Sequence, residues 1–386
     1  MSVTSIPDQV KFRLWGKAGG RCQYEGCNKP LWIDGLTKAE FNIAYLAHII
    51  ADKPDGPRGH PVLSEKLKTD ISNIMLMCDE HHRRIDKVDV AGHSVERLQK
   101  MKVTHEKRIE LLTSIQEEMK SHIILYGANI GEHHSQVNWE KAANAMVPIF
   151  YPAENRAIEL SLKNSSFHDN NKDYWLIERQ HLKNQFLQYI KPRLASGEVN
   201  HFSIFGLAPI PLLIKLGYLL SDIPKADVYQ LHREPPDWKW QSHPDHSQYK
   251  IAEPDSRHAN VAINMSLSAT VDPSRISEVL KEPHSVWTMS VDIPNNDFLK
   301  SQSQLCQFRT CFRELLDRIK AEHGERSTLH IFPAIPVSIA VEIGRVWMPK
   351  ADLPMMIYDQ NRNLGGFVPA FRIPNLVEEK GLSSPF

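Results

Sequence analysis

Apolar residues follow two different patterns along the chain, and the change between them suggests how it is organised. From residue 94 to 119 they recur near every 3.6 residues, which predicts one amphipathic helix with Ser94 as its N-cap. From about residue 121 onward, short apolar runs typical of strands alternate with helical stretches. Repeated strand–helix–strand units predict a mostly parallel sheet covered by helices, in a Rossmann-like α/β arrangement.

One strand–helix–strand unit occurs twice within this α/β part. The first copy reads HFSIFGLAPIPLLIKLG and then ADVYQLHR, and the second reads LHIFPAIPVSIAVEIG and then PMMIYDQN. Each passes through an Ile-Pro pair, Ile210-Pro211 or Ile335-Pro336, into an apolar helix that ends near glycine. The spacing from proline to glycine is six residues in one copy and eight in the other. We therefore expect two related α/β halves in one domain.

Length and composition fit a multidomain protein. The chain has 386 residues, for which two or three domains are the natural expectation, and its formal net charge is zero. Neutrality provides no global signature of nucleic-acid binding, although a local basic face can hide inside a neutral total. The sequence has no apolar run long enough to span a bilayer and no signal-peptide core at its start, so we expect a cytoplasmic protein without a membrane partner.

The cysteines point to a metal rather than to disulfides. Five cysteines are an odd and sparse set for a chain of this length. Cys22 and Cys27 form a C-x4-C pair, and Cys78 with His81 forms a C-x2-H pair further along. Two such pairs in one short segment predict a structural Zn²⁺ site. The other two cysteines repeat the C-x4-C spacing without a partner pair, inside a helical pattern, and are expected to be ordinary helix residues.

A second cation is suggested by the histidine next to this pair. Successive side chains on a helix diverge by about 100°, so His82 and His81 cannot easily serve the same ion. Asp86 follows His82 by four residues and shares its helix face. The two form a plausible ligand pair for Mg²⁺ or Mn²⁺. The alternative is a solvated histidine and an aspartate paired with a neighbouring cation.

Upstream residues complete a recognisable set. His48 lies near the end of the apolar strand FNIAYLAHII, where a polar side chain is costly without a role or a partner. Asn73 follows, and His82 comes nine residues after it. With the Cys-rich knuckle, this segment resembles the HNH, or ββα-metal, endonucleases. The resemblance implies that His48 is the general base, that Asn73 fixes the loop orienting it, and that His82 and Asp86 bind the catalytic cation for phosphodiester hydrolysis.

This segment departs from the HNH pattern at one position. Many HNH members carry a metal ligand just before the base, where this chain has Ala47. Asp86 therefore becomes more important to the cation shell, and Asp52 or His60 are further candidates. Arg58 and the tandem arginines after His82 are candidate phosphate contacts, with solvated surface charge as the equal alternative.

The α/β part offers a second type of site. A strand, a proline turn and a helix N-terminus present free backbone N–H groups to an anion, and the sequence provides this at GLAPIP and again at FPAIP. Nearby tryptophans could stack on a nucleobase or simply pack beneath a proline-rich loop. The candidate ligand-binding residues are Pro209, Ile210, Arg233, Trp238, Trp240, Ala334 and Pro336. The sequence has no G-x-G-x-x-G or P-loop motif, which argues against a dinucleotide cofactor or an NTPase.

The segments FGLAPIPLLIKLGYLL and LHIFPAIPVSIAVEIGRVW resemble SAVED domains, which are fused pairs of CARF-like Rossmann units that bind cyclic oligonucleotides. The whole chain resembles an HNH–SAVED effector of bacterial antiphage signalling. We accordingly expect an HNH domain over residues 1–92, a connecting helix over 93–120 and a SAVED domain over 121–386.

This resemblance implies a mechanism of activation. A cyclic di- or trinucleotide binds the SAVED domain and drives a homo-oligomer, from dimer to tetramer, whose HNH modules degrade double-stranded DNA with little sequence preference. Two alternatives stay open. One is a cyclic-nucleotide sensor with a non-catalytic, zinc-stabilised HNH-like domain, and the other is an RNA nuclease.

Overall fold

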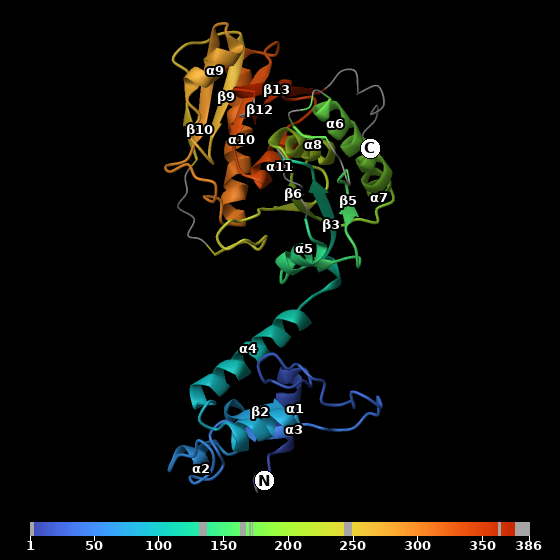
Figure 1. Ribbon diagram of the computed structural model, residues 1–386, viewed down its shortest axis with the longest axis vertical. Helices are drawn as coiled ribbons and strands as arrows, with labels where there is room; N and C mark the ends of the chain where they lie inside the picture. The colour runs from blue at the N-terminus through green and yellow to red at the C-terminus, as the bar shows by residue number, and fades with distance from the viewer. Residues whose placement is uncertain are drawn as a thin grey trace. The chain divides into compact units, whose positions relative to one another are not determined.

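The computed structural model describes residues 4–130, 137–162, 167–169, 171, 173–242, 249–361 and 364–374. Contacts within the chain divide it into two compact units, Met1–Gln116 and Glu117–Phe386 (Figure 1). In the described part of the chain, no helix has both the length and the apolar character needed to cross a membrane.

The first unit is a short two-stranded sheet surrounded by helices. Strands β1 and β2 pair antiparallel, with His48 opposite Ile74, and all four residues of β2 are buried. Its core is small and gathers apolar side chains from α1, β2 and α4, such as Leu14, Leu76 and Leu98. The elements are α1 (Asp8–Ala18), β1 (Tyr45–His48), α2 (Leu63–Leu67), η1 (Ile71–Asn73), β2 (Ile74–Met77), α3 (Asp79–Arg83), η2 (Arg84–Val88) and α4 (Val95–Thr113).

The helix expected to connect the domains belongs to the first unit. Helix α4 starts at the expected N-cap, because the Ser94 hydroxyl accepts a hydrogen bond from the Arg97 amide. It ends at Thr113, earlier than predicted, where the Thr113 and Ser114 hydroxyls bond back to carbonyls of the preceding turn. His105 Nε2 lies 2.9 Å from the Ala18 carbonyl and ties α4 to α1. The boundary between the units therefore falls after this helix.

The first half of the second unit contains a parallel sheet with strand order β4-β3-β6-β7, and β5 pairs with β3. Side chains alternate across β3, so that Ile124 packs in one hydrophobic cluster and Ile123 in another. The elements are η3 (Glu117–Met119), β3 (Lys120–Gly127), α5 (Trp139–Met146), β4 (Tyr151–Pro152), β5 (Ile158–Glu159), α6 (Tyr174–Gln185), η4 (Phe186–Ile190), α7 (Lys191–Ala195), β6 (Phe202–Leu207), α8 (Ile210–Leu220) and β7 (Ala226–Tyr229).

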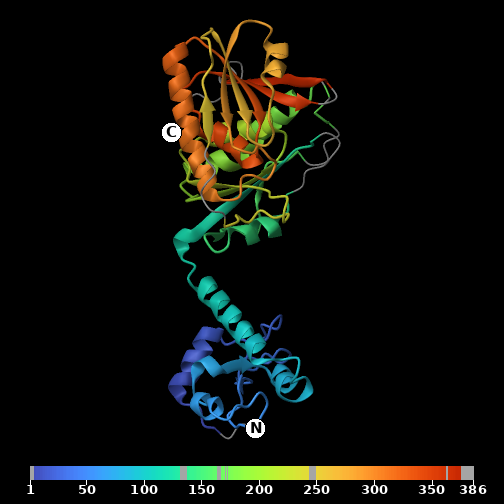
Figure 2. The same ribbon diagram turned by 90° about the vertical axis from the view of Figure 1, so that its left-hand side faces the viewer.

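The second half contains a six-stranded sheet in the order β13-β12-β11-β9-β10-β8, with four parallel inner strands and antiparallel edges. Val261 and Ile263 of β9 cluster with residues of α10, whereas Ala262 between them clusters with Ile276 of α9. Figure 2 shows α10 running beside this sheet. The elements are β8 (Lys250–Ala252), β9 (Asn260–Ser266), α9 (Pro273–Leu280), β10 (His284–Ser290), α10 (Gln302–His323), β11 (Leu329–Ala334), α11 (Val337–Val346), β12 (Met355–Asn361) and β13 (Gly366–Ile373). The expectation of a mixed α/β fold is confirmed.

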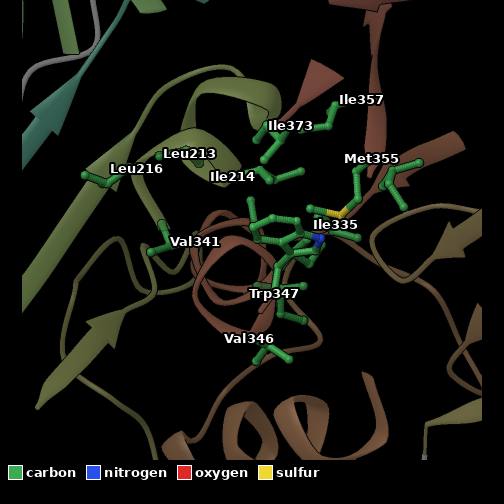
Figure 3. Packing of buried hydrophobic residues seen from close by; sticks show 14 of the residues in the cluster. Leu213, Ile214, Leu216, Ile335, Val341, Val346, Trp347, Met355, Ile357 and Ile373 are labelled. Carbon is green, nitrogen blue, oxygen red and sulfur yellow. The ribbon is translucent and has the colours of Figure 1, made fainter. Parts of the chain in front are cut away.

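The two halves meet where α8 crosses α11, backbone against backbone. A Cβ atom added at Gly217 would lie 1.9 Å from the Val341 carbonyl oxygen, and one added at Gly344 would lie 2.0 Å from the Ile214 carbonyl oxygen. Each glycine thus faces the residue three positions before the other glycine. Figure 3 shows the apolar packing around this crossing, with Ile214 and Trp347 among the labelled side chains. The contact is reciprocal, as expected for a pseudo-twofold axis between the two helices.

The structure aligns the internal repeat differently from the sequence. Pro209 and Pro336 are the N-cap residues of α8 and α11, and each precedes its crossing glycine by eight residues. Pro209, rather than Pro211, is therefore equivalent to Pro336, and the apparent difference in spacing disappears. The same Phe–Tyr stack joins the neighbouring strands in both halves. The stacked pairs are Phe205–Tyr229, with ring centroids 4.4 Å apart, and Phe332–Tyr358, at 4.3 Å.

Candidate functional sites: a histidine-lined pocket, a Cys/His cluster and a pocket in the second unit

His48 stands at the end of β1, where the strand places it in a pocket of about 620 Å³. It is largely buried, and its Nε2 lies 2.8 Å from the Lys68 carbonyl oxygen. Because a carbonyl can only accept a hydrogen bond, Nε2 carries the proton and Nδ1 keeps the lone pair. A neutral imidazole held in this tautomer can take a proton from water through Nδ1.

Asn73 holds the loop that follows His48. The Asn73 side chain is buried, and its Oδ1 accepts a hydrogen bond from the Ile50 amide at 2.8 Å. Its Nδ2 donates to the Ile50 carbonyl at 2.9 Å and to the Leu67 carbonyl at 3.3 Å. One carboxamide thereby fixes both backbone groups of Ile50, two residues beyond His48. Asn73 itself does not line the pocket, so its part in the site is to position the backbone.

The same pocket contains His82 and Asp86, which the helical turn after Cys78 brings to the side of His48. His82 Nε2 lies 3.2 Å from an Asp86 carboxylate oxygen, and the His82 ring stacks on Tyr45 with centroids 4.8 Å apart. Atoms at this separation can ligate one cation together once Nε2 is deprotonated, so Nε2 is the His82 nitrogen that faces a cation shared with Asp86. Asp52 also lines the pocket, whereas His60 does not.

Arg58 braces this pocket from within the protein. Its side chain is only 6% exposed, and Nη2 donates to Asp86 Oδ1 at 2.6 Å. Its other donors reach the Ile49 and Ile85 carbonyls, each at 2.7 Å. Although burial alone would raise the pKa of Asp86, hydrogen bonds from His82 and Arg58 keep it below its usual value. Arg58 is thus a buried structural residue and not the phosphate contact considered from the sequence.

The loop carrying Arg58 is tight enough to fold this long side chain inward. A Cβ atom at Gly59 would lie 2.3 Å from the Pro54 carbonyl oxygen, and one at Gly56 would lie 2.6 Å from the Ala51 Cβ. Arg58 itself adopts a left-handed backbone with φ of 57°. The close approach explains why the Gly-Pro-Arg-Gly stretch carries glycine on both sides of the arginine.

Cys22, Cys27, Cys78 and His81 converge on one point, with ligand atoms all within 4.8 Å of one another. Cys78 Sγ lies 3.1 Å from His81 Nδ1, and all three thiols are free. Burial raises the pKa of the Cys22 and Cys78 thiols, and burial lowers the pKa of His81. Three sulfurs and one imidazole at this spacing match the donor set of a tetrahedral zinc site. His81 belongs to this cluster and His82 to the pocket.

Another group in the second unit meets the same spacing criterion but carries its own counter-charge. His122, Glu154 and Glu198 offer ligand atoms within 4.8 Å of one another. Arg193 forms ion pairs with Glu154 at 3.2 Å and with Glu198 at 3.5 Å. The guanidinium already pairs with both carboxylates, so we assign no metal to this group.

A pocket of about 490 Å³ lies at the carboxyl ends of strands from both halves of the second unit. It is lined by Gln230 to Arg233 after β7 and by Ile335 to Val337 at the start of α11, with Ser268 after β9. The Gln230 carboxamide oxygen accepts hydrogen bonds from the Ser338 amide and hydroxyl, at 3.2 and 2.8 Å. One half of the unit thereby caps a helix of the other.

Only part of the expected ligand-binding set lies at this pocket. Arg233 and Pro336 line it, whereas Pro209, Ile210 and Ala334 do not. The tryptophans pack instead: Trp238 is 3% exposed and meets Phe205 edge-on, and Trp240 meets the buried His232. Gln230 and Ser268 also line the pocket but were not predicted to, because no sequence motif marks them. The polar finish of the strand ADVYQLHR was the available signal for Gln230.

Residues 182–373 match the family model of SAVED, described as the SMODS-associated and fused to various effectors sensor domain. No curated protein matches the chain.

Among solved structures, the chain is similar to an Acinetobacter baumannii Cap4 SAVED/CARF-domain containing receptor with the cyclic trinucleotide 2′3′3′-cAAA, at 14% identity and a TM-score of 0.42. That match covers 72% of this chain and 60% of the receptor, so the chain spans less than two thirds of its length. A Moraxella osloensis Cap4 SAVED/CARF-domain containing receptor matches at 11% identity and a TM-score of 0.42, over 80% of this chain and 70% of that one.

Proposed function

We propose that this chain, in which residues 182–373 match a sensor domain, is a metal-dependent endonuclease that cleaves double-stranded DNA when its second unit binds a cyclic oligonucleotide. The observation that carries the proposal is the pocket of the first unit. His48 and His82 line it together, on a strand and the helix packed against it, and Asn73 braces the loop between. The order of these residues is that of the HNH resemblance, and the pocket shared by His48 and His82 supports it.

The chain's own residues supply the steps of phosphodiester hydrolysis. Nδ1 of His48 takes a proton from the attacking water, while the Lys68 carbonyl holds the opposite nitrogen in its protonated form. His82 and Asp86 would hold Mg²⁺ or Mn²⁺, which stabilises charge on the phosphate and the leaving oxygen. Asp86 binds His82 and Arg58 through different oxygens, and each oxygen keeps a further lone pair for ligation.

Cys22, Cys27, Cys78 and His81 would hold a structural Zn²⁺. The first unit buries few apolar side chains, and a bound metal adds its binding free energy to the folding of such a unit. The raised pKa values of the Cys22 and Cys78 thiols mean that a bound cation would have to drive the deprotonation of these two ligands.

The second unit would control the first through its ligand. The pocket combines the Arg233 side chain with the start of α11 and joins both halves of the unit, which suits a cyclic di- or trinucleotide with several phosphates. A ligand that binds an assembled state more tightly shifts the population toward it, from monomer to dimer or tetramer. Assembly gathers several nuclease pockets and so favours cutting of both DNA strands, a suitable response to phage infection.

Plasmid cleavage tests the proposal. Purified full-length protein is incubated with plasmid, Mg²⁺ and a panel of cyclic di- and trinucleotides that includes 2′3′3′-cAAA. We expect cleavage only with one or two ligands, and none by the His48→Ala variant. Ligand-dependent cleavage that survives His48→Ala contradicts the catalytic assignment, and cleavage without ligand contradicts the control by the second unit.

The same assay separates the alternatives. Ligand binding without loss of plasmid or RNA by the wild-type protein indicates a sensor with a non-catalytic HNH-like unit. Preferential loss of a labelled RNA in a parallel reaction indicates an RNA nuclease.

A further inference from the structure

Positive charge is concentrated in the first unit although the whole chain is neutral. Residues 1–116 contain 18 Lys and Arg against 15 Asp and Glu, a formal charge of +3, which leaves −3 on the remaining residues. A hollow of about 480 Å³ in this unit lies between the turn after Cys22 and helix α4, away from the residues of the histidine-lined pocket. We call it the knuckle groove. It is lined by Gln23, Tyr24, Glu25, Gly26, Asn28, Arg97, Lys100, Met101, Thr104, His105 and Arg108.

Two guanidinium groups meet at one residue beside this groove. Arg21 donates to the Asn28 carbonyl at 3.1 Å, and Arg108 donates to the Asn28 side-chain oxygen at 2.8 Å. Among the described residues, no carboxylate lies within 4.0 Å of the charged groups of Arg21, Arg108 or Lys100. The one carboxylate lining the groove, Glu25, is already paired with Arg97. The groove therefore carries positive charge that the protein does not neutralise.

The groove is also held in shape before any partner arrives. Asn28 has a left-handed backbone with φ of 54° and is clasped by both arginines. Arg21 in turn lies 5.4 Å from the centroid of the Trp32 ring. The Arg21 and Arg108 guanidinium groups repel each other, and an anion bound between them would offset this repulsion. The ordered donors thus make a preformed site for phosphate oxygens.

The groove is connected to the proposed cutting site through the Cys/His cluster. Tyr24 lines the groove and stacks on His81, with ring centroids 4.0 Å apart. His81 is followed directly by His82, which lines the histidine-lined pocket. A duplex held at the groove is therefore anchored next to the segment that carries His82.

We propose that the knuckle groove binds the phosphate backbone of duplex DNA through Arg21, Lys100 and Arg108, as an anchoring surface separate from the cleavage pocket. The inference rests on the proposed function for the identity of the polyanion. Phosphate contacts of this kind position a protein on DNA without reading its sequence, in keeping with low sequence preference. They also make binding depend on salt, because each neutralised phosphate releases counterions.

Binding measured without cleavage tests the inference. A fluorescent 30-base-pair duplex is titrated with full-length protein carrying His48→Ala, and the affinity is followed by anisotropy across a range of NaCl concentrations. The test variant adds Arg21→Gln, Lys100→Gln and Arg108→Gln. The control instead adds three matched substitutions on exposed cations elsewhere in the first unit, Arg13→Gln, Lys38→Gln and Lys66→Gln. Thermal melting and bound zinc confirm that both variants are folded.

We expect the test variant to bind at least about 10-fold more weakly than the control at 100 mM NaCl. We also expect the slope of log affinity against log salt to fall by about 2 to 3, near 0.9 for each lost phosphate contact. The inference is overturned if the test and control variants have the same affinity and the same salt slope, whether or not both bind more weakly than the protein with His48→Ala alone. The proposed function can fail independently of this inference. If the wild-type protein cuts no plasmid, the nuclease proposal is refuted. If the groove variant nevertheless binds DNA more weakly than the control, the inference about the groove still holds.

Discussion

The buried pair of Arg58 and Asp86 provides a quantitative test of how the histidine-lined pocket is held together. Replacing Arg58 by Met removes the guanidinium but keeps an unbranched side chain of similar length. Removing one partner of a buried ion pair typically costs 3–5 kcal/mol, because the other charge is left without compensation. The Asp86 side chain is 23% exposed, so water recovers part of that loss. We therefore expect Arg58→Met to destabilise the first unit by about 3 kcal/mol.

A second substitution tests the mechanism as well as the size of this effect. Asp86→Asn removes the charge that Arg58→Met leaves unpaired, so the two changes together should cost about 1–2 kcal/mol less than the sum of the single changes. Arg13→Met, at an exposed arginine of α1, serves as the control and should stay within about 0.5 kcal/mol of the wild type.

Hydrogen exchange followed by mass spectrometry is the suitable assay, because it measures opening of residues 45–89 in the intact chain, independently of the second unit. Additive effects of the two substitutions would refute the reasoning, since additivity means that the residues do not sense each other's charge. An unchanged opening free energy in Arg58→Met would refute it as well.

Three further predictions concern other parts of the chain. Gly344→Ala should lower the melting temperature of the second unit markedly, because its Cβ would lie 2.0 Å from a carbonyl oxygen of α8, whereas Gly16→Ala, in open space on α1, should not destabilise the protein. Cys22→Ser should abolish bound zinc and destabilise the first unit, and Cys306→Ser, at an exposed position, should leave the zinc content measured by atomic absorption unchanged. Burial, with a contribution from a neighbouring carboxylate, raises the pKa of Asp359 to about 7, so the native state holds this proton more tightly than the unfolded state and stability falls as pH rises from about 4 through 7. The Asp359→Asn variant should therefore have a higher melting temperature than the wild type at pH 8 and a similar one near pH 4. A difference in melting temperature that does not change between pH 4 and pH 8 would contradict the assignment.

Most predictions for the first unit rested on the spacing of residues that are close in sequence. The two Cys/His pairs, the histidine ending an apolar strand and the His82–Asp86 spacing are short-range features, and the structure brings each set together. Arg58 could not be placed in this way. Its burial depends on a tight glycine-flanked turn that only the folded loop shows, and a lone arginine in a polar loop otherwise suggests solvent.

The second unit shows where sequence reasoning reached its limit. Alternation of strands and helices predicted the α/β class, because periodicity is a local property. The lining of its pocket depends on contacts such as Gln230 to Ser338, which are 108 residues apart in sequence. Trp238 could equally have faced a ligand or the core, and composition does not decide which, whereas the structure packs it against Phe205.

The reciprocal crossing of α8 and α11 has a consequence for how the second unit can vary. In a dimer of identical chains, one substitution at a twofold contact changes both copies at once. In a single chain the two sides of the contact have separate positions in the sequence, so their residues can differ, and here they do. Gln230 on one side caps the helix that bears Ser338, while the equivalent positions on the other side hold Asp359 and Pro211. The two sides of the crossing therefore present different side chains at equivalent positions, which two copies of one chain cannot do.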